Sequence, residues 1–145
     1  MDIKEFFEYT LKILEDNNID FVLHGAVAMG AYGYIRTTQD IDIIIGPISE
    51  KKLTEIFKNA GYEVMKTQWI ETGLIYRFKY SEWLLDVFVN INKTKWWKER
   101  LKSIRAELMG KDIKIISKDE LIRRKLIRGL DRDLWDVHVL RLIKD

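Results

Sequence analysis

Three aspartates, Asp40, Asp42 and Asp86, are the side chains best suited to chemistry in this sequence. Asp40 and Asp42 alternate with isoleucines before an apolar run, a pattern that predicts a strand over residues 40–45. Because successive strand side chains point to opposite faces, the two carboxylates share one face, where like charges repel and lose hydration. Hard oxygen ligands of this kind favour Mg²⁺.

Asp86 is the third candidate, because it interrupts the apolar run LLDVFV, where an unpaired charge is costly. If its strand lies beside residues 40–45, it completes a two-metal site of the type that catalyses phosphoryl transfer. Ordinary alternatives stay open. Asp40 and Asp42 would be solvated at a strand entrance, and Asp86 would cap a neighbouring element or pair with Arg77 or another base.

Gly25 follows the apolar run 21–24 and precedes a segment rich in small residues, which predicts a strand, a glycine and then a helix. The free N–H groups and positive dipole end of such a helix favour an anion. An anion-binding helix start upstream of a carboxylate pair predicts a site for a Mg²⁺-nucleotide.

The segment 21–45 resembles the nucleotidyltransferase superfamily of DNA polymerase beta-like fold. Within that superfamily it is most similar to the small prokaryotic members that include the AbiEii-type toxins. The likeness covers most of the chain. Its N-terminal motif is carried by Gly25, Ala26, Ala28, Gly33, Arg36, Thr38, Asp40, Ile41 and Asp42, the later strand carboxylate by Asp86, and the C-terminal helical motif by Lys125, Arg132, Asp133 and Asp136.

The resemblance implies transfer of a nucleoside monophosphate from an NTP, such as ATP, to an acceptor hydroxyl, with release of pyrophosphate. It implies two Mg²⁺ ions, or Mn²⁺, on the three aspartates, with Asp86 helping to deprotonate the acceptor. It also implies nucleotide contacts from Gly25, Ala26, Arg36, Thr38 and Lys125. Ala26 stands where the superfamily has Gly or Ser, so only its backbone N–H is offered to the triphosphate.

Two other functions are compatible with the same sequence. One is a non-catalytic nucleotide-binding partner module of toxin–antitoxin type, which Ala26 favours and the intact carboxylate triad opposes. The other is an RNA-binding protein that uses Trp96 and Trp97 among basic residues. The acceptor is not identified by the sequence, and tRNA, a protein and a small molecule such as an aminoglycoside all remain candidates.

Several of the remaining candidates also have structural readings. His24 is expected to bond a backbone group, Arg36 to be a solvated loop charge or a phosphate ligand, and Lys125 by itself to be a surface lysine. The Trp pair is expected to be half core. Salt bridges between two helices are the expected role of Arg132, Asp133 and Asp136.

Composition limits the class of protein. The chain has 145 residues, 47% hydrophobic and 33% charged, with a net charge of +2, as expected for one globular domain. It contains no cysteine, which excludes disulfides and thiolate zinc sites. With neither a signal-peptide pattern nor a run long enough to cross a membrane, we expect a cytoplasmic protein without membrane partners.

The elements that must position these residues predict an α/β (α+β) fold: a mixed sheet flanked by helices, closed by a C-terminal helical pair. We expect a single domain, 1–145, with a catalytic sheet in 1–92 and a helical extension in 93–145. Helices are predicted at 2–16, 26–32, 50–60, 93–105, 117–128 and 131–143. Strands are predicted at 21–24, 40–45, 62–66, 74–79 and 83–89, with a hairpin at 107–116.

Overall fold

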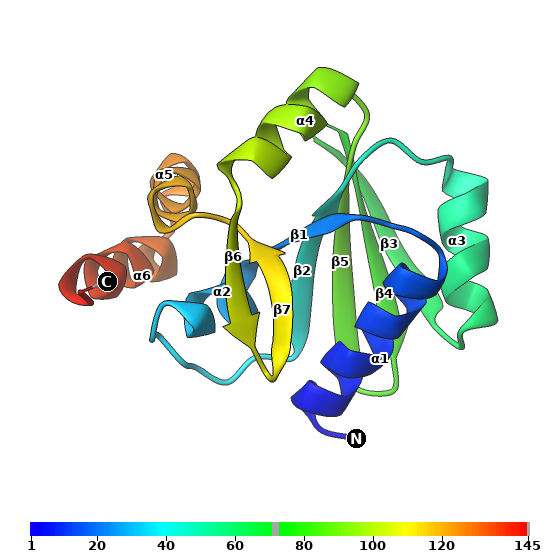
Figure 1. Ribbon diagram of the computed structural model, residues 1–145, viewed down its shortest axis with the longest axis horizontal. Helices are drawn as coiled ribbons and strands as arrows, with labels where there is room; N and C mark the ends of the chain where they lie inside the picture. Colours follow the sequence, from blue (N-terminus) through cyan, green and yellow to red (C-terminus); the bar gives the residue numbers. More distant parts are fainter. Residues whose placement is uncertain (71–72, 145) are drawn as a thin grey trace.

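The computed structural model describes residues 1–70 and 73–144, and within them the chain forms six helices around one mixed sheet (Figure 1). The sheet has seven strands in the order β3-β4-β5-β2-β1-β7-β6. The helices are α1 (Ile3–Asp16), α2 (Gly25–Ala31), α3 (Glu50–Asn59), α4 (Lys93–Lys102), α5 (Lys118–Arg128) and α6 (Asp131–Leu142). The strands are β1 (Phe21–His24), β2 (Asp40–Ile45), β3 (Glu63–Ile70), β4 (Gly73–Tyr80), β5 (Trp83–Asn90), β6 (Ile104–Leu108) and β7 (Lys111–Ile115).

The central strands set the register that matters for function. Strand β2 runs parallel to β5, so that Asp42 lies beside Asp86, and antiparallel to β1, so that Asp42 lies beside His24. On the far side of β5, the antiparallel strand β4 places Arg77 beside Asp86. Side chains at paired positions project from the same face of a sheet, so all four polar groups share one face.

The opposite face of the sheet is the apolar core. Alternation places Ile41, Ile43 and Ile45 of β2 there, each at most 1% exposed, with Leu85 and Val87 of β5 beside them. Helices α1 and α3 cover this face in Figure 1. Their contribution includes Phe6, Phe7, Leu14, Leu53 and Phe57, all of them buried. Truncating one such large side chain to alanine typically costs about 2–5 kcal/mol, so this face fixes the strands that carry the aspartates.

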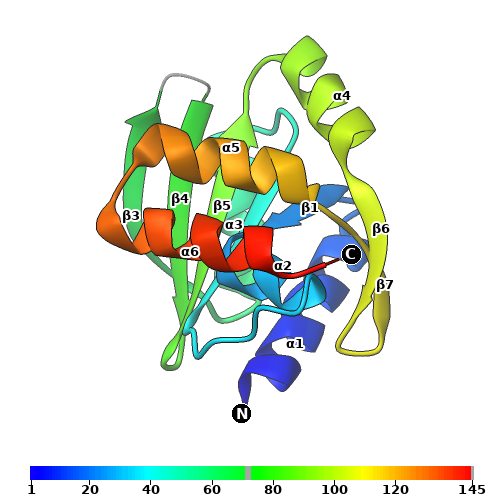
Figure 2. The same ribbon diagram turned by 90° about the vertical axis from the view of Figure 1, so that its left-hand side faces the viewer.

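Helices α5 and α6 cover the polar face, lying side by side across the sheet in Figure 2. Gly129 ends α5 in a left-handed conformation, with φ +65° and its N–H donated to the carbonyl of Lys125. This turn sends the chain back along α5, and the resulting pair closes the space in front of the carboxylates.

Most predicted elements are confirmed, including the mixed sheet, the C-terminal helical pair and the hairpin predicted at 107–116, which β6 and β7 form. Helix α4 ends at Lys102 rather than Arg105, because residues 104–108 pair with β7. Leu130 is the N-cap residue of α6, and the Asp133 carboxylate accepts its N–H. Ser117 caps α5 by accepting the N–H of Glu120, and the Glu120 side chain binds two arginines.

Residues 93–145 are not purely helical, since β6 and β7 extend the same sheet through a parallel pairing with β1. The division of the domain after residue 92 stays a prediction. Among the helices of the described residues, none is long and apolar enough to cross a membrane.

Candidate functional site

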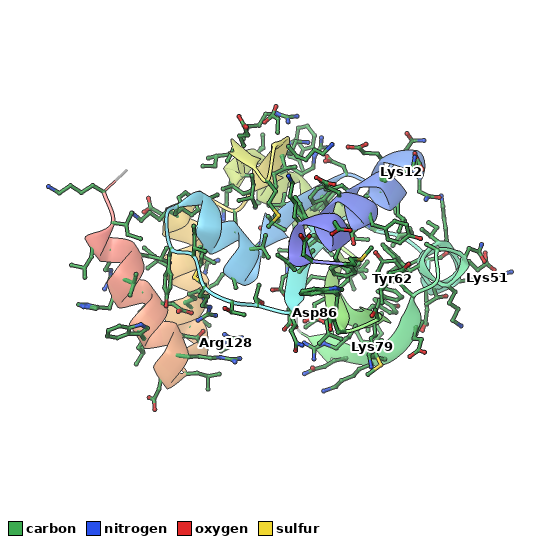
Figure 3. All side chains as sticks on the ribbon, turned by 90° about the horizontal axis from the view of Figure 1, so that it is seen from below. Lys12, Lys51, Tyr62, Lys79, Asp86 and Arg128 are labelled. Carbon is green, nitrogen blue, oxygen red and sulfur yellow. The ribbon has the colours of Figure 1, made fainter. Side chains whose placement is uncertain are left out.

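A cavity of about 380 Å³ lies between the polar face of the sheet and α5. In Figure 3, Asp86 on the sheet and Arg128 on α5 lie at facing sides of this space. Acidic and basic side chains meet here from β2, β4, β5, α5 and α6. The lining residues are His24, Gly25, Ala26, Arg36, Thr38, Asp40, Asp42, Ile44, Arg77, Asp86, Phe88, Arg124, Lys125, Arg128 and Arg132.

The three aspartates lie together on one wall of the cavity, on adjacent strands, as the family resemblance implied. Burial, reinforced by the charges of Asp86 and Asp40 and a hydrogen bond with Asp86, raises the pKa of Asp42 to about 7. Burial also raises the pKa of Asp40, although the nearby Arg77 guanidinium opposes that shift. This wall therefore concentrates more negative charge than its surroundings neutralise.

Arg77 is the cation of this wall. Its Nε and one terminal nitrogen donate to the two oxygens of Asp86 at 2.7 and 2.8 Å, and it approaches Asp40 at 3.6 Å. The pKa of Arg77 is raised, chiefly by its hydrogen bonds to Asp86. The pairing of Asp86 with Arg77 and its position beside Asp42 are thus both present in one structure.

The carboxylate oxygens of the three aspartates are the type of ligand that a hard divalent cation prefers. Such an ion would also offset the repulsion among these carboxylates on one face of the sheet. The present arrangement is not a finished metal site. In residues 1–70 and 73–144, no group of three or more His, Cys, Asp or Glu side chains is placed so that it could hold a metal ion. Arg77 holds both oxygens of Asp86, so that carboxylate must turn from Arg77 to join Asp40 and Asp42 around an ion.

Gly25, the first residue of α2, is required by the close approach of the backbone to Asp42 at this point. A Cβ at this position would lie 2.0 Å from Oδ2 of Asp42, and Gly25 has φ +69°. The half-buried Ala26 follows it on the cavity wall. Thr38 also lines the cavity, and its hydroxyl accepts the N–H of Asp40 at 3.1 Å, which fixes the start of β2.

Lys125 lines the cavity but is buried, 8% exposed, and donates to Asp136 at 2.9 Å. Arg36 donates to the other oxygen of Asp136 at 2.9 Å, which ties the loop before β2 to α6. Arg128 forms a two-point ion pair with Asp133, and this contact lowers the pKa of Asp133. The salt bridges predicted for Asp133 and Asp136 are therefore present. Lys125 is a partner of both carboxylates and not a surface lysine.

Arg132 is the exception among the motif residues of α6. It is exposed, lines the cavity, and has no ion-pair partner within the part of the chain that the structure describes. Its charge lowers the pKa of Asp40, against the larger effect of burial, so it lies within electrostatic reach of the aspartates. The predicted interhelical salt bridge of Arg132 is not seen.

His24 belongs to a buried network that joins three elements. Its Nε2 lies 3.2 Å from Oε1 of Glu99 on α4, and Arg124 of α5 binds the other oxygen of Glu99. Burial lowers the pKa of His24, although Glu99 partly opposes this. The partner of His24 is thus a side chain and not the expected backbone group.

Arg124 and Arg128 are cavity residues that the sequence analysis missed. Their spacing of four residues places them on one face of a helix, with Lys125 beside them, and this spacing was the available signal. A basic helix face alone does not show what it covers, so the signal was indistinguishable from a solvated surface.

The two tryptophans of α4 have different environments. Trp96 packs so tightly against Gly46 that a Cβ there would lie 2.5 Å from its ring. Trp97 is 56% exposed, with the Arg100 guanidinium 5.5 Å from its ring centroid. The expectation of a half-core pair therefore holds in this sense, with one ring packed and the other left at the surface.

Comparison with known proteins gives a consistent result at the level of structure. No protein-family model and no curated protein sequence matches the chain. The lincomycin-bound lincosamide antibiotic adenylyltransferase LnuA superposes with a TM-score of 0.71 at 18% identity, with 99% of each chain covered. The chain has the nucleotidyltransferase fold.

Two further structures support this assignment. The antibiotic-resistance factor ANT(2'')-Ia gives a TM-score of 0.71 at 14% identity, covering 94% of this chain and 81% of its own. An antigenic nucleotidyltransferase-like protein from Paracoccidioides brasiliensis gives 0.57 at 18% identity, covering 94% and 74%. At these identities the likeness establishes the nucleotidyltransferase fold, as the sequence motif predicted, and leaves activity to be argued from the site.

Proposed function

We propose that this chain is a divalent-metal-dependent nucleotidyltransferase that uses the cavity between the sheet and α5. The observation that carries the proposal is the pairing of opposite walls. Asp40, Asp42 and Asp86 concentrate negative charge on the sheet, and basic side chains from α5 and α6 face them. A nucleoside triphosphate with divalent ions matches both walls, because the ions suit the carboxylates and the phosphates suit the bases.

The backbone of Gly25 and Ala26, with Arg36 and Thr38, would hold the nucleotide near the aspartates. Of the cations on the helical wall, Arg132 is the best placed to bind phosphate, because it has no ion-pair partner in the described part of the chain. Lys125 contributes less directly than its motif implies, since it already binds Asp136. We assign Lys125 to positioning α5 against α6 at the edge of the cavity.

In the proposed reaction, the acceptor hydroxyl oxygen forms a bond to the α-phosphorus, and the bond from that phosphorus to the pyrophosphate oxygen breaks. Once the Asp86 carboxylate has separated from Arg77, it accepts the proton of the acceptor hydroxyl. The basic side chains of α5 and α6 stabilise the negative charge of the departing pyrophosphate. Bound to Asp40, Asp42 and Asp86, Mg²⁺ or Mn²⁺ would supply Lewis-acid stabilisation of the phosphoryl oxygens. Removing one preorganised electrostatic contact of this kind typically costs about 3–4 kcal/mol of barrier.

The acceptor is to be found among tRNA, proteins and small molecules. Likeness to a lincosamide antibiotic adenylyltransferase adds lincosamides to the aminoglycosides among the small molecules to test. We expect the protein to act in the cytoplasm, where NTPs and Mg²⁺ are available. The more specific assignment to AbiEii-type toxins rests on the sequence motif alone.

The experiment incubates the protein with each α-labelled NTP, Mg²⁺ and, separately, total RNA, total protein and antibiotic pools. We expect label on one acceptor class, and none with Asp42→Ala. Asp112→Ala is the matched control, because Asp112 is an exposed hairpin carboxylate that pairs with Arg105, away from the cavity. Full labelling by the Asp42 variant would refute the mechanism. Mg²⁺-dependent NTP binding without transfer to any pool would favour the non-catalytic module instead.

A second candidate, RNA binding through α4, is favoured by the exposure of Trp97 among lysines. Stacking on an exposed aromatic typically contributes about 1–3 kcal/mol per base. RNA affinity should then fall steeply with salt and with Trp97→Ala, whereas Asp42→Ala should bind normally.

A further inference from the structure

Helix α6 presents two chemically different faces. Its inner face carries Asp133, Asp136, Val137 and Leu140, all buried against the rest of the chain. Its outer face points away from the sheet (Figure 2). That face carries Leu134, Trp135 and Leu142, which are 49%, 61% and 68% exposed. Clustered large apolar side chains of this kind on a surface helix mark an interaction site more often than scattered ones do.

The outer residues follow a continuous stripe along the helix. Asp131, Leu134, Trp135, His138, Arg141 and Leu142 are spaced as i, i+3, i+4, i+7, i+10 and i+11. This is the spacing with which one helix packs along another over three turns. The rings of Trp135 and His138 lie 5.6 Å apart between centroids, so the middle of the stripe is already an ordered aromatic surface.

The two ends of the stripe carry opposite charges. Asp131 and Arg141 are both exposed, and neither has an ion-pair partner in residues 1–70 and 73–144. They are ten residues apart, or about 15 Å along the helix axis. If two copies of α6 lie antiparallel about a two-fold axis near position 136, Asp131 of each copy faces Arg141 of the other. The same pairing puts Leu134 opposite His138, and a parallel pairing would place like charges together.

We propose that the outer face of α6 is the interface of a homodimer related by two-fold symmetry. The stripe is complementary to itself in both charge and apolar character, which is what an isologous contact requires. The arrangement leaves the cavity inside each protomer, since Arg132, the α6 residue that lines the cavity, is not part of the stripe. This inference does not depend on nucleotidyl transfer, because none of its residues lines the cavity.

The first test is the mass of the full-length protein by sedimentation velocity over a range of concentrations. We expect a dimer that dissociates on dilution, and Leu134→Asp should make it monomeric at concentrations where the wild type is dimeric. The matched control is Leu101→Asp on α4. It makes the same change at another exposed leucine, 68% exposed, on a different surface, and it should leave the dimer intact. A wild-type protein that is monomeric at every concentration would overturn the proposal, even if it binds a different protein through this face.

A charge reversal tests the register. Asp131→Arg and Arg141→Asp should each weaken dimerisation by about tenfold or more, because each creates two like-charge pairs by symmetry. The double variant should return to within about threefold of the wild type. The helix dipole alone predicts a different result. Each single change places the wrong charge at an end of α6, so the double variant would be weaker than either single variant. A double variant as weak as the singles, or weaker, would rule out this antiparallel contact.

Discussion

Gly25→Ala is the perturbation for which the structure predicts the most specific result. The new Cβ would lie 2.0 Å from Oδ2 of Asp42, and contact becomes ordinary only at 3.4 Å. The carboxylate must therefore withdraw by about 1.4 Å or the backbone must move. Misplacement by about 1 Å can cost on the order of 100-fold in rate, and we expect a loss of that size in pyrophosphate release.

The change also has a backbone cost that must be separated from the clash. Gly25 has φ +69°, and a side chain in the left-handed region costs about 1–2 kcal/mol. For a chain of this length, that lowers the melting temperature by roughly 3–6 °C. Gly110→Ala is the matched control, because Gly110 has φ +78° in the turn between β6 and β7, with nothing within 4 Å of its Cβ position.

The assay compares both variants by thermal melting, by the Mg²⁺ concentration that half-saturates thermal stabilisation, and by pyrophosphate release. Gly110→Ala should lose stability but keep the Mg²⁺ response and activity of the wild type. Gly25→Ala should lose stability by a similar or larger amount, need more Mg²⁺, and release pyrophosphate on the order of 100-fold more slowly. If the two variants behave alike in Mg²⁺ response and activity, the close approach of Gly25 to Asp42 has no functional role and the reasoning fails.

Three further predictions concern charge. Arg77→Met should cost about 1–3 kcal/mol in EDTA, and added Mg²⁺ should stabilise it more than the wild type, because Asp86 is then free; an unchanged Mg²⁺ effect would contradict this. Lys125→Met should cost about 3 kcal/mol by leaving its buried acidic partner less compensated, whereas the exposed Lys98→Met should not change the melting temperature. Glu120 has its pKa lowered to about 2, chiefly by Arg123, so its stabilisation is complete above the unfolded pKa near 4.5 and is lost as pH falls toward 2; the melting temperature of Glu120→Gln should lack that part of the acid transition.

The aspartate wall was predictable from sequence because strands impose a strict period of two. The alternation of Asp40 and Asp42 with buried isoleucines fixes their face regardless of what surrounds the strand. Asp86 required more, since its face relative to Asp42 depends on which strands are neighbours. The parallel pairing of β2 with β5 spans two intervening strands and a helix of sequence, and only the family motif indicated it.

The helical wall was less predictable, because charge partners between helices depend on packing. The sequence shows a lysine at position 125 and an acid at position 136, and it does not show that they meet at 2.9 Å. Nor does it show that Arg36, 100 residues from Asp136, binds the same carboxylate. Helix spacing indicates which side chains share a face, whereas the identity of the opposing face is a tertiary property.

The two walls of the cavity differ in how their charges are balanced, and this difference favours function over stability. On the helical wall, Asp133 is matched by Arg128, and Asp136 is matched by Lys125 and Arg36. On the sheet wall, Arg77 is shared by Asp86 and Asp40, while Asp42 has no ion-pair partner in the described residues and a pKa near 7. A fold selected only for stability would replace Asp42 with an apolar residue, since its ionisation costs free energy here. A bound cation, as proposed above, would neutralise this excess negative charge and would give a reason to retain Asp42.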